Sequence, residues 1–151
     1  LIVAGIIDSY SPNAISKSEI EQWHNNGLIR WLDNCRDMPK LLASVNIVVL
    51  PTTYGEGVPR ILIEAASCGL PIVATNIAGC REIVQDGVNG FLVPPNNPEA
   101  IRVSLEKLIK DACLRSRMGK AGRLMVLKTF SEKIVIEKTL NVYKNLLDSL
   151  I

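Results

Sequence analysis

Short apolar runs and segments of helical periodicity take turns along the first hundred residues. The apolar runs are rich in Ile, Val and Leu and predict buried strands at residues 1–6, 28–32, 46–50, 71–75 and 90–93, the last of them at a sheet edge. Helices are predicted between them at residues 16–25, 37–44, 59–68 and 79–84. Parallel strands need crossover connections of this kind. The pattern therefore predicts an α/β protein with a parallel sheet flanked by helices.

The last third of the chain is predicted to be helical throughout. Asn97 and Pro98 form a cap and first-position pair, and apolar residues then recur at helical spacing. A basic helix is predicted over residues 111–129, and a final helix begins at Ser131. The 151 residues, 48% of them apolar, are enough for one core, so we predict a single domain with a helical extension over residues 98–151.

The charge balance excludes some classes of partner. The chain carries a formal net charge of +2, which gives no support for a nucleic-acid binder. Residues 1–100 hold 6 basic and 10 acidic side chains, a net of −4, whereas residues 101–151 hold 11 and 5, a net of +6. The basic third is interpreted as the solvated face of surface helices, with contact to an anionic membrane leaflet as the alternative. One His and no Cys-x-x-Cys pair give no support for a zinc site.

The predicted helix at residues 59–68 contains one carboxylate among apolar side chains. A helix that is apolar all round is buried, so Glu64 is expected to be buried with it, as is the Cys68 thiol. A buried carboxylate needs a partner. The partner is either a guanidinium, Arg60 one turn back or Arg81, or a ligand that donates two hydrogen bonds, such as the vicinal hydroxyls of a ribose.

The loop before this helix predicts an anion site. Gly57 and Val58 precede Pro59, which is expected at the first helical position, and the free amides of the first turn would point at a phosphate. Glu56 stands in the same loop, where a carboxylate is tolerated beside a phosphate only if it faces neutral hydroxyl groups. The segment thus offers sites for a sugar, a phosphate and a ribose, which together describe a nucleotide-sugar.

These residues resemble a known family. Residues 54–93, YGEGVPRILIEAASCGLPIVATNIAGCREIVQDGVNGFLV, resemble the C-terminal, nucleotide-sugar-binding domain of the family 4 retaining glycosyltransferases, including bacterial enzymes that extend lipid-linked surface sugars. Glu56 and Glu64 match the two acids of that family's Glu-x7-Glu motif, and three further family segments follow in order. The resemblance implies a Rossmann-like domain that forms one half of a two-domain enzyme.

The resemblance also implies roles for individual residues. Glu56 would contact the donor sugar as the catalytic residue, and Gly57, Val58, Pro59 and Arg60 would lie against the diphosphate, Pro59 by position only. Glu64 would bind the ribose, and the base would lie near residues 31–34, with Trp31 and Asn34 as its neighbours. The family's usual Leu-Gly in that loop is Leu32-Asp33 here.

Further expectations concern the whole enzyme. The donor is a UDP- or GDP-hexose, the acceptor a glycan or lipid-linked glycan, and neither cofactor nor metal is expected. The expected location is the cytoplasm, at the periphery of the inner membrane. The family's first strand, its loop with a phosphate-binding Arg and Lys, and the N-terminal acceptor domain have no counterpart in this sequence, so we expect the chain alone to be inactive. A non-catalytic nucleotide-binding or interaction module and one half of a sugar-nucleotide epimerase are the alternatives.

Overall fold

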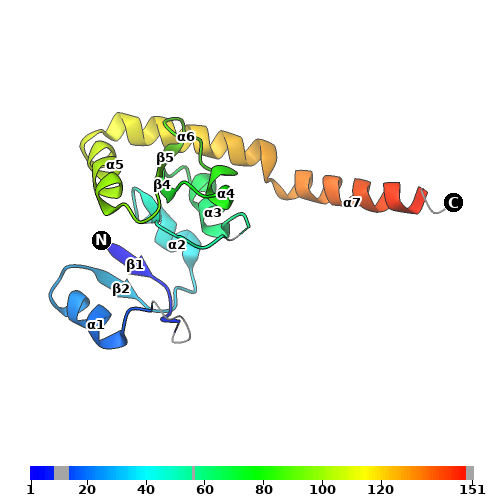
Figure 1. Ribbon diagram of the computed structural model, residues 1–151. Helices are drawn as coiled ribbons and strands as arrows, with labels where there is room; N and C mark the ends of the chain where they lie inside the picture. Colours follow the sequence, from blue (N-terminus) through cyan, green and yellow to red (C-terminus); the bar gives the residue numbers. More distant parts are fainter. Residues whose placement is uncertain (9–13, 56, 149–151) are drawn as a thin grey trace. The chain divides into compact units, whose positions relative to one another are not determined.

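A computed structural model gives the structure of the chain and describes residues 1–8, 14–55 and 57–148 (Figure 1). The chain divides into two compact units, Leu1–Leu41 and Leu42–Ile151. Helix α2, Met38–Ala43, contains the boundary between them. Because each unit has its own internal packing, the two are described separately.

The first unit is a strand–helix–strand unit. Strands β1, Ile2–Ala4, and β2, Arg30–Leu32, pair in parallel with Val3 opposite Trp31, and helix α1, Lys17–Asn25, connects them. The Ser16 side chain accepts a hydrogen bond from the amide of Glu19 and caps α1. The predicted parallel pairing and helix start are confirmed, and each strand is shorter than its apolar run.

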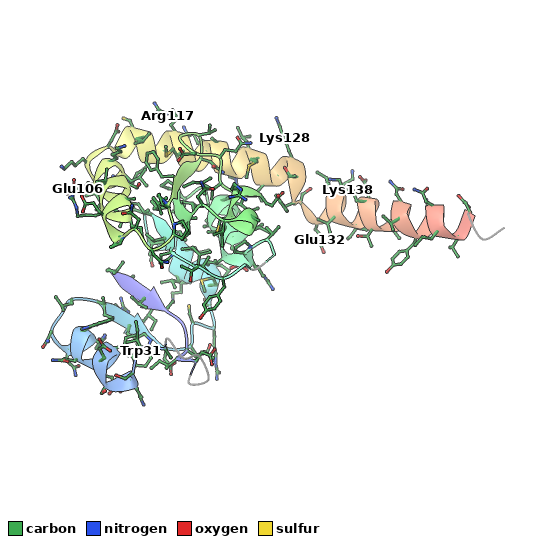
Figure 2. The ribbon with its side chains drawn as sticks, viewed as in Figure 1. Trp31, Glu106, Arg117, Lys128, Glu132 and Lys138 are labelled. Carbon is green, nitrogen blue, oxygen red and sulfur yellow. The ribbon has the colours of Figure 1, made fainter. Side chains whose placement is uncertain are left out.

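Trp31 ties the elements of the first unit together (Figure 2). Its backbone amide donates to His24 Nδ1 at 3.0 Å, which links β2 to the end of α1. Its indole Nε1 donates to the carbonyl of Gly5 at 3.1 Å, directly after β1. Both polar hydrogens of this residue therefore serve the fold.

The second unit is built on a three-stranded parallel sheet. Strands β3, Val48–Leu50, β4, Ile72–Thr75, and β5, Gly90–Val93, occur in the order β3-β4-β5. Every residue of the central strand is buried, and β5 lies at the edge, as predicted. Helix α3, Arg60–Ser67, and the short helix α4, Ala78–Arg81, make the crossovers.

Three helices follow the sheet: α5, Pro98–Lys110, α6, Ala112–Thr129, and α7, Glu132–Asp148. Val73 and Val93 of the sheet, Leu108 of α5 and Met118 of α6 form a core cluster in which all four are nearly inaccessible to solvent. The predicted helical extension is confirmed over residues 98–148, and its first two helices share one core with the sheet.

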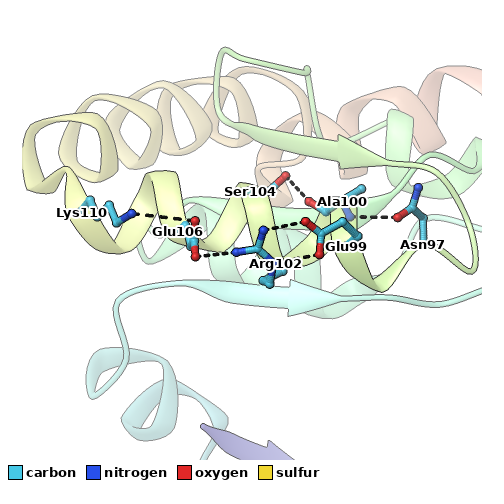
Figure 3. Close-up of polar contacts among 7 residues, drawn as sticks. All are labelled: Asn97, Glu99, Ala100, Arg102, Ser104, Glu106 and Lys110. Atoms are coloured by element: carbon cyan, nitrogen blue, oxygen red, sulfur yellow. Dashed lines mark hydrogen bonds and ion pairs between the residues drawn. The ribbon is translucent and has the colours of Figure 1, made fainter.

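Helix α5 is stabilised along its exposed side by polar contacts (Figure 3). Asn97 Oδ1 accepts from the amide of Ala100 at 2.9 Å and caps the helix as predicted. Arg102 binds Glu99 and Glu106, at 2.6 Å to each. The hydrogen bond from Arg102 holds the pKa of Glu99 below its ordinary value, and both carboxylates raise the pKa of Arg102.

Two of the basic residues in the last third of the chain bind carbonyl groups at the ends of helices. Arg115 Nη1 donates to the carbonyls of Leu108 and Ile109 at the end of α5, and Arg123 Nη1 donates to the carbonyl of Ser67 at the end of α3. A guanidinium is favourable there, because the last carbonyls of a helix lack partners and carry partial negative charge. Both arginines lie on α6, which has no acidic side chain.

Helix α7 differs from the other two, because none of its described residues is buried. Seven large apolar side chains of α7 are about half exposed: Val135, Ile136, Leu140, Val142, Tyr143, Leu146 and Leu147. At 100° per residue they lie within one broad stripe, with the six charged residues mostly on the other side. Of the helices that the structure describes, none combines the length and apolar character needed to cross a bilayer.

Asn89 organises the turn before β5, and its replacement by Ala is expected to destabilise the second unit. The side chain is 1% exposed, donates to the carbonyl of Ile83 at 2.7 Å and accepts from the amide of Gln85 at 2.7 Å. Losing it leaves two backbone groups unpaired, at about 1–3 kcal/mol each, so we expect Asn89→Ala to lower the free energy of unfolding by about 2–4 kcal/mol. Urea denaturation measures this, with the exposed Asn141→Ala as the control. Equal effects of the two substitutions would contradict the assignment.

Candidate nucleotide-sugar site

The loop between β3 and α3 lies at the carboxyl end of the sheet, where parallel α/β proteins bind ligands. Gly57 and Val58 are exposed in this loop and Pro59 is buried. Glu56, the predicted catalytic residue, lies outside the described residues. The structure therefore places four of the five consecutive predicted site residues at this edge.

Pro59 is the N-cap of α3, not its first helical residue. Its ψ angle of 118° is extended, and its carbonyl accepts the amide of Leu62 at 3.0 Å, so the helix begins at Arg60. The predicted first-position role of Pro59 is thus wrong by one residue. Since proline has no capping side chain, no side chain among the described residues caps the amides of the first turn. Such amides favour an anion in front of the helix.

Glu64 is half-buried rather than buried, which corrects the sequence prediction. Its side chain is 33% exposed, and Oε1 accepts from Arg60 Nε at 2.8 Å, while the Arg60 side chain is 90% exposed. The fully buried positions of α3 are Leu62, Ala65 and Ala66. Helix α3 contacts α6, β3 and β4. It therefore has one buried face and is not enclosed on all sides. Cys68, at its end, is exposed for the same reason.

The Arg60–Glu64 pair is weak enough to be exchanged for a ligand. Ion pairs four residues apart on an exposed helix contribute about 0.3–0.5 kcal/mol, and a basic residue preceding the acid is the less favourable order. Within the described residues, Glu64 Oε2 has no hydrogen bond. A carboxylate with one free oxygen and one loosely held oxygen can accept two hydroxyl hydrogens. Arg81, the other predicted partner, donates to Asn76 instead, at 3.0 Å to Oδ1.

A hollow of about 270 Å³ lies at the carboxyl ends of β1 and β2 in the first unit. Its lining is Ala4, Gly5, Ile6, Asp33, Asn34, Cys35 and Met38. Asn34, predicted near the base, lines it, whereas Trp31 does not and uses its indole hydrogen within the fold. Asp33 also lines it and falls inside the predicted range 31–34, but it is not among the residues predicted to bind the donor. The signal that could have found it is its place where the resembled family has glycine.

A second hollow, of about 320 Å³, lies at the carboxyl ends of the three strands of the second unit, beside Pro51, Thr75 and Pro94. Asn96, which lines it too, has a φ angle of 55°, a left-handed conformation that asparagine adopts more readily than most residues. Across the described part of the chain, no three His, Cys, Asp or Glu side chains are grouped so as to hold a metal ion.

Solved structures share this arrangement of strands and helices over part of their length. HepE of Anabaena, solved in complex with UDP-glucose, superimposes with a TM-score of 0.80 over 95% of this chain and 40% of its own, at 23% identity. The C-terminal domain of LpcC, a group 1 glycosyl transferase of Francisella tularensis, superimposes with a TM-score of 0.67 over 77% of this chain and 63% of its own, at 28% identity.

The family follows from the sequence itself. Residues 1–125 match the family of glycosyl transferases group 1, and the chain belongs to that family. The capsular polysaccharide biosynthesis glycosyltransferase CapM of Staphylococcus aureus is 31% identical over 147 residues. That alignment covers 97% of this chain and 38% of CapM, so the chain spans well under half the length of this relative.

Proposed function

We propose that this chain is the nucleotide-sugar-binding part of a retaining family 4 glycosyltransferase. In the complete enzyme it would bind a UDP- or GDP-hexose for transfer to a glycan or lipid-linked acceptor in bacterial surface polysaccharide synthesis. The observation that carries this proposal is the half-exposed Glu64 carboxylate on α3, one turn after a helix start that no described side chain caps. It is supported by the family match and by CapM, whose name assigns it to capsular polysaccharide biosynthesis.

Each predicted residue has a role in this proposal. The amides near Gly57, Val58 and Arg60 bind the diphosphate, with Pro59 fixing the helix start. Glu64 accepts hydrogen bonds from the ribose, and Asn34 lies beside the base. Trp31 holds the loop of the base site in place through Gly5. Glu56 contacts the donor sugar as the catalytic residue, by its position in the motif.

The chemistry needs charge stabilisation at the leaving group. As the bond between the sugar and the diphosphate breaks, the ring carbon of the sugar gains positive charge and the departing nucleoside diphosphate gains negative charge. Amides oriented at that anion stabilise it more in the transition state than in the bound donor, because the charge grows during the reaction. No metal is required by this scheme, since backbone amides and cationic side chains of the whole enzyme take the place of a divalent ion.

The helix start alone is insufficient for catalysis. A helix terminus stabilises an anion by about 0.3–1 kcal/mol, rising to ~2 in partly buried geometries. Enzymes lower barriers by roughly 8–23 kcal/mol. The rest of the barrier lowering is expected from the acceptor domain and from the loop with Arg and Lys in the resembled family.

The charge of the helices bears on contact with the inner membrane at its cytoplasmic face. Helix α7 carries Glu132, Glu137 and Asp148 against three lysines, so its apolar stripe has no net positive charge beside it. The exposed cations of α6 that bind no helix end are Arg117, Lys120 and Lys128. Figure 2 labels Arg117 and Lys128. If the enzyme attaches to an anionic leaflet, these three residues are the expected contact.

We expect the isolated chain to bind a nucleotide-sugar weakly and to leave it intact, and the complete enzyme to transfer the sugar. Calorimetric titration with UDP- and GDP-hexoses tests binding, and mass spectrometry of products with and without a glycan acceptor tests turnover. Transfer to the acceptor by the full-length enzyme supports the proposal. Conversion of the donor to an isomeric sugar nucleotide without acceptor would indicate an epimerase. Absence of binding to either donor would favour an interaction module.

A further inference from the structure

Among the described residues that line the hollow at the ends of β1 and β2, Asp33 provides the carboxylate. It directly follows β2, and its backbone carbonyl accepts from the amide of Gly5 at 3.2 Å, which holds the loop against the end of β1. Among the described residues its carboxylate has no hydrogen bond or ion pair, and the residue is exposed. Asn34, next to it, adds an amide to the lining.

The size and position of the hollow suit one part of a nucleotide. At about 270 Å³ it is smaller than the ~300–1,000 Å³ of sites that enclose whole drug-sized ligands. The apolar side chains of Ala4, Ile6 and Met38 provide surface for a planar ring, and the polar groups are grouped on the loop after β2. A flat ring with a polar edge is the ligand that such a lining fits.

The acid in this lining distinguishes between bases. An ionised carboxylate accepts hydrogen bonds and cannot donate them. Guanine presents two adjacent donors, N1–H and N2–H, which match the two oxygens of one carboxylate. Uracil presents a single donor, N3–H, between two carbonyl oxygens, and a carboxylate facing that edge has an oxygen against an oxygen. The guanine carbonyl next to N1 is left to accept from an amide such as Asn34.

We propose that Asp33 makes this site selective for guanine nucleotides, so that the donor is a GDP-sugar. This inference rests on the proposed nucleotide-sugar function and goes beyond it by naming the base. A charge-assisted bidentate pair is stronger than a neutral hydrogen bond, and its loss leaves a carboxylate facing acceptors. The structure therefore assigns the choice of base to one exposed side chain outside the motif at α3.

Calorimetric titration of this chain with GDP, UDP and inosine diphosphate tests the inference. We expect GDP to bind roughly tenfold more tightly than UDP, the ratio that one bidentate base contact provides. Inosine diphosphate lacks the N2 amino group and should bind more weakly than GDP. In Asp33→Asn the amide offers one donor and one acceptor, which match the O6 and N1–H of guanine as well as a carbonyl and the N3–H of uracil, so the preference for GDP should fall to near parity.

Asp37→Asn is the matched control. It removes the same charge four residues away, keeps the Oδ1 that accepts the amide of Lys40, and does not line the hollow. The control should retain the preference of the unmodified chain for GDP. UDP binding as tightly as GDP, or an unchanged ratio in Asp33→Asn, would overturn the inference while leaving the proposed function intact. Failure of all three nucleotides to bind would overturn both the guanine preference and the proposed nucleotide-sugar function.

Discussion

Replacing Gly119 by Ala is expected to destabilise the second unit by about 3 kcal/mol or more. A Cβ atom at this position would lie 1.8 Å from the carbonyl oxygen of Gly69 and 2.7 Å from its carbon, so backbone would have to move. Overpacking of a buried site costs about 1–3 kcal/mol, and more where the obstacle is main chain. Because Gly69 ends the α3 segment with a φ angle of 71°, the same contact positions the helix that bears Glu64. Urea denaturation measures the free energy of unfolding of the variant and of the unmodified chain.

Gly122→Ala in the same helix is the control for this prediction. Its Cβ would lie 3.5 Å from the Cβ atoms of Ala66 and Asn89, an ordinary contact, although the residue is buried like Gly119. Alanine favours a helix interior over glycine by roughly 0.5–1 kcal/mol, so this variant should be as stable as the unmodified chain or slightly more so. If the two variants lose stability equally, the close approach of α6 to Gly69 is not what holds the unit together.

Glu64→Gln is expected to weaken nucleotide-sugar binding by roughly 10- to 100-fold and to leave stability within ~0.5 kcal/mol of the unmodified chain. Gln keeps the shape of the side chain, but it loses the charge and one acceptor. A hydrogen bond to a charged group contributes about 1.5–3 kcal/mol, which corresponds to this range of affinity. The ion pair with Arg60 contributes little to folding, because both side chains are accessible to water. Calorimetry and thermal unfolding measure the two effects.

Arg60→Ala separates a ligand role of Glu64 from a structural one. It removes the same ion pair but keeps the Glu64 carboxylate and the amide at position 60. If Glu64 binds ribose, this variant should retain the affinity for the nucleotide that Glu64→Gln loses. Identical small losses of stability in both variants, with unchanged binding, would show that Glu64 is only the partner of Arg60.

The order and type of most elements follow from local pattern. The five predicted strands correspond to β1 to β5, because Ile- and Val-rich runs bounded by turn residues favour buried strands. Ser16 and Asn97 both cap helices as predicted, since a cap depends on the residue itself and on the amides two or three positions later. The assignment of β5 to an edge is confirmed as well.

Burial at the candidate site could not be predicted in the same way. The apolar content of residues 60–69 indicated a helix enclosed on all sides, yet only one face of α3 packs and Glu64 stays half-exposed. Which face is covered depends on α6, fifty residues away, and on Gly119, whose missing side chain admits the contact. The hollow that contains Asp33 likewise depends on the pairing of β1 with β2. Such features belong to tertiary contacts, which periodicity does not encode.

A crystal structure of this chain with a bound nucleoside diphosphate tests whether Glu64 binds the ribose. We expect the ribose 2′- and 3′-hydroxyls to donate hydrogen bonds to the Glu64 carboxylate and the diphosphate to lie in front of the first turn of α3. A nucleotide whose ribose lies elsewhere, with Glu64 bound only to Arg60, would contradict it.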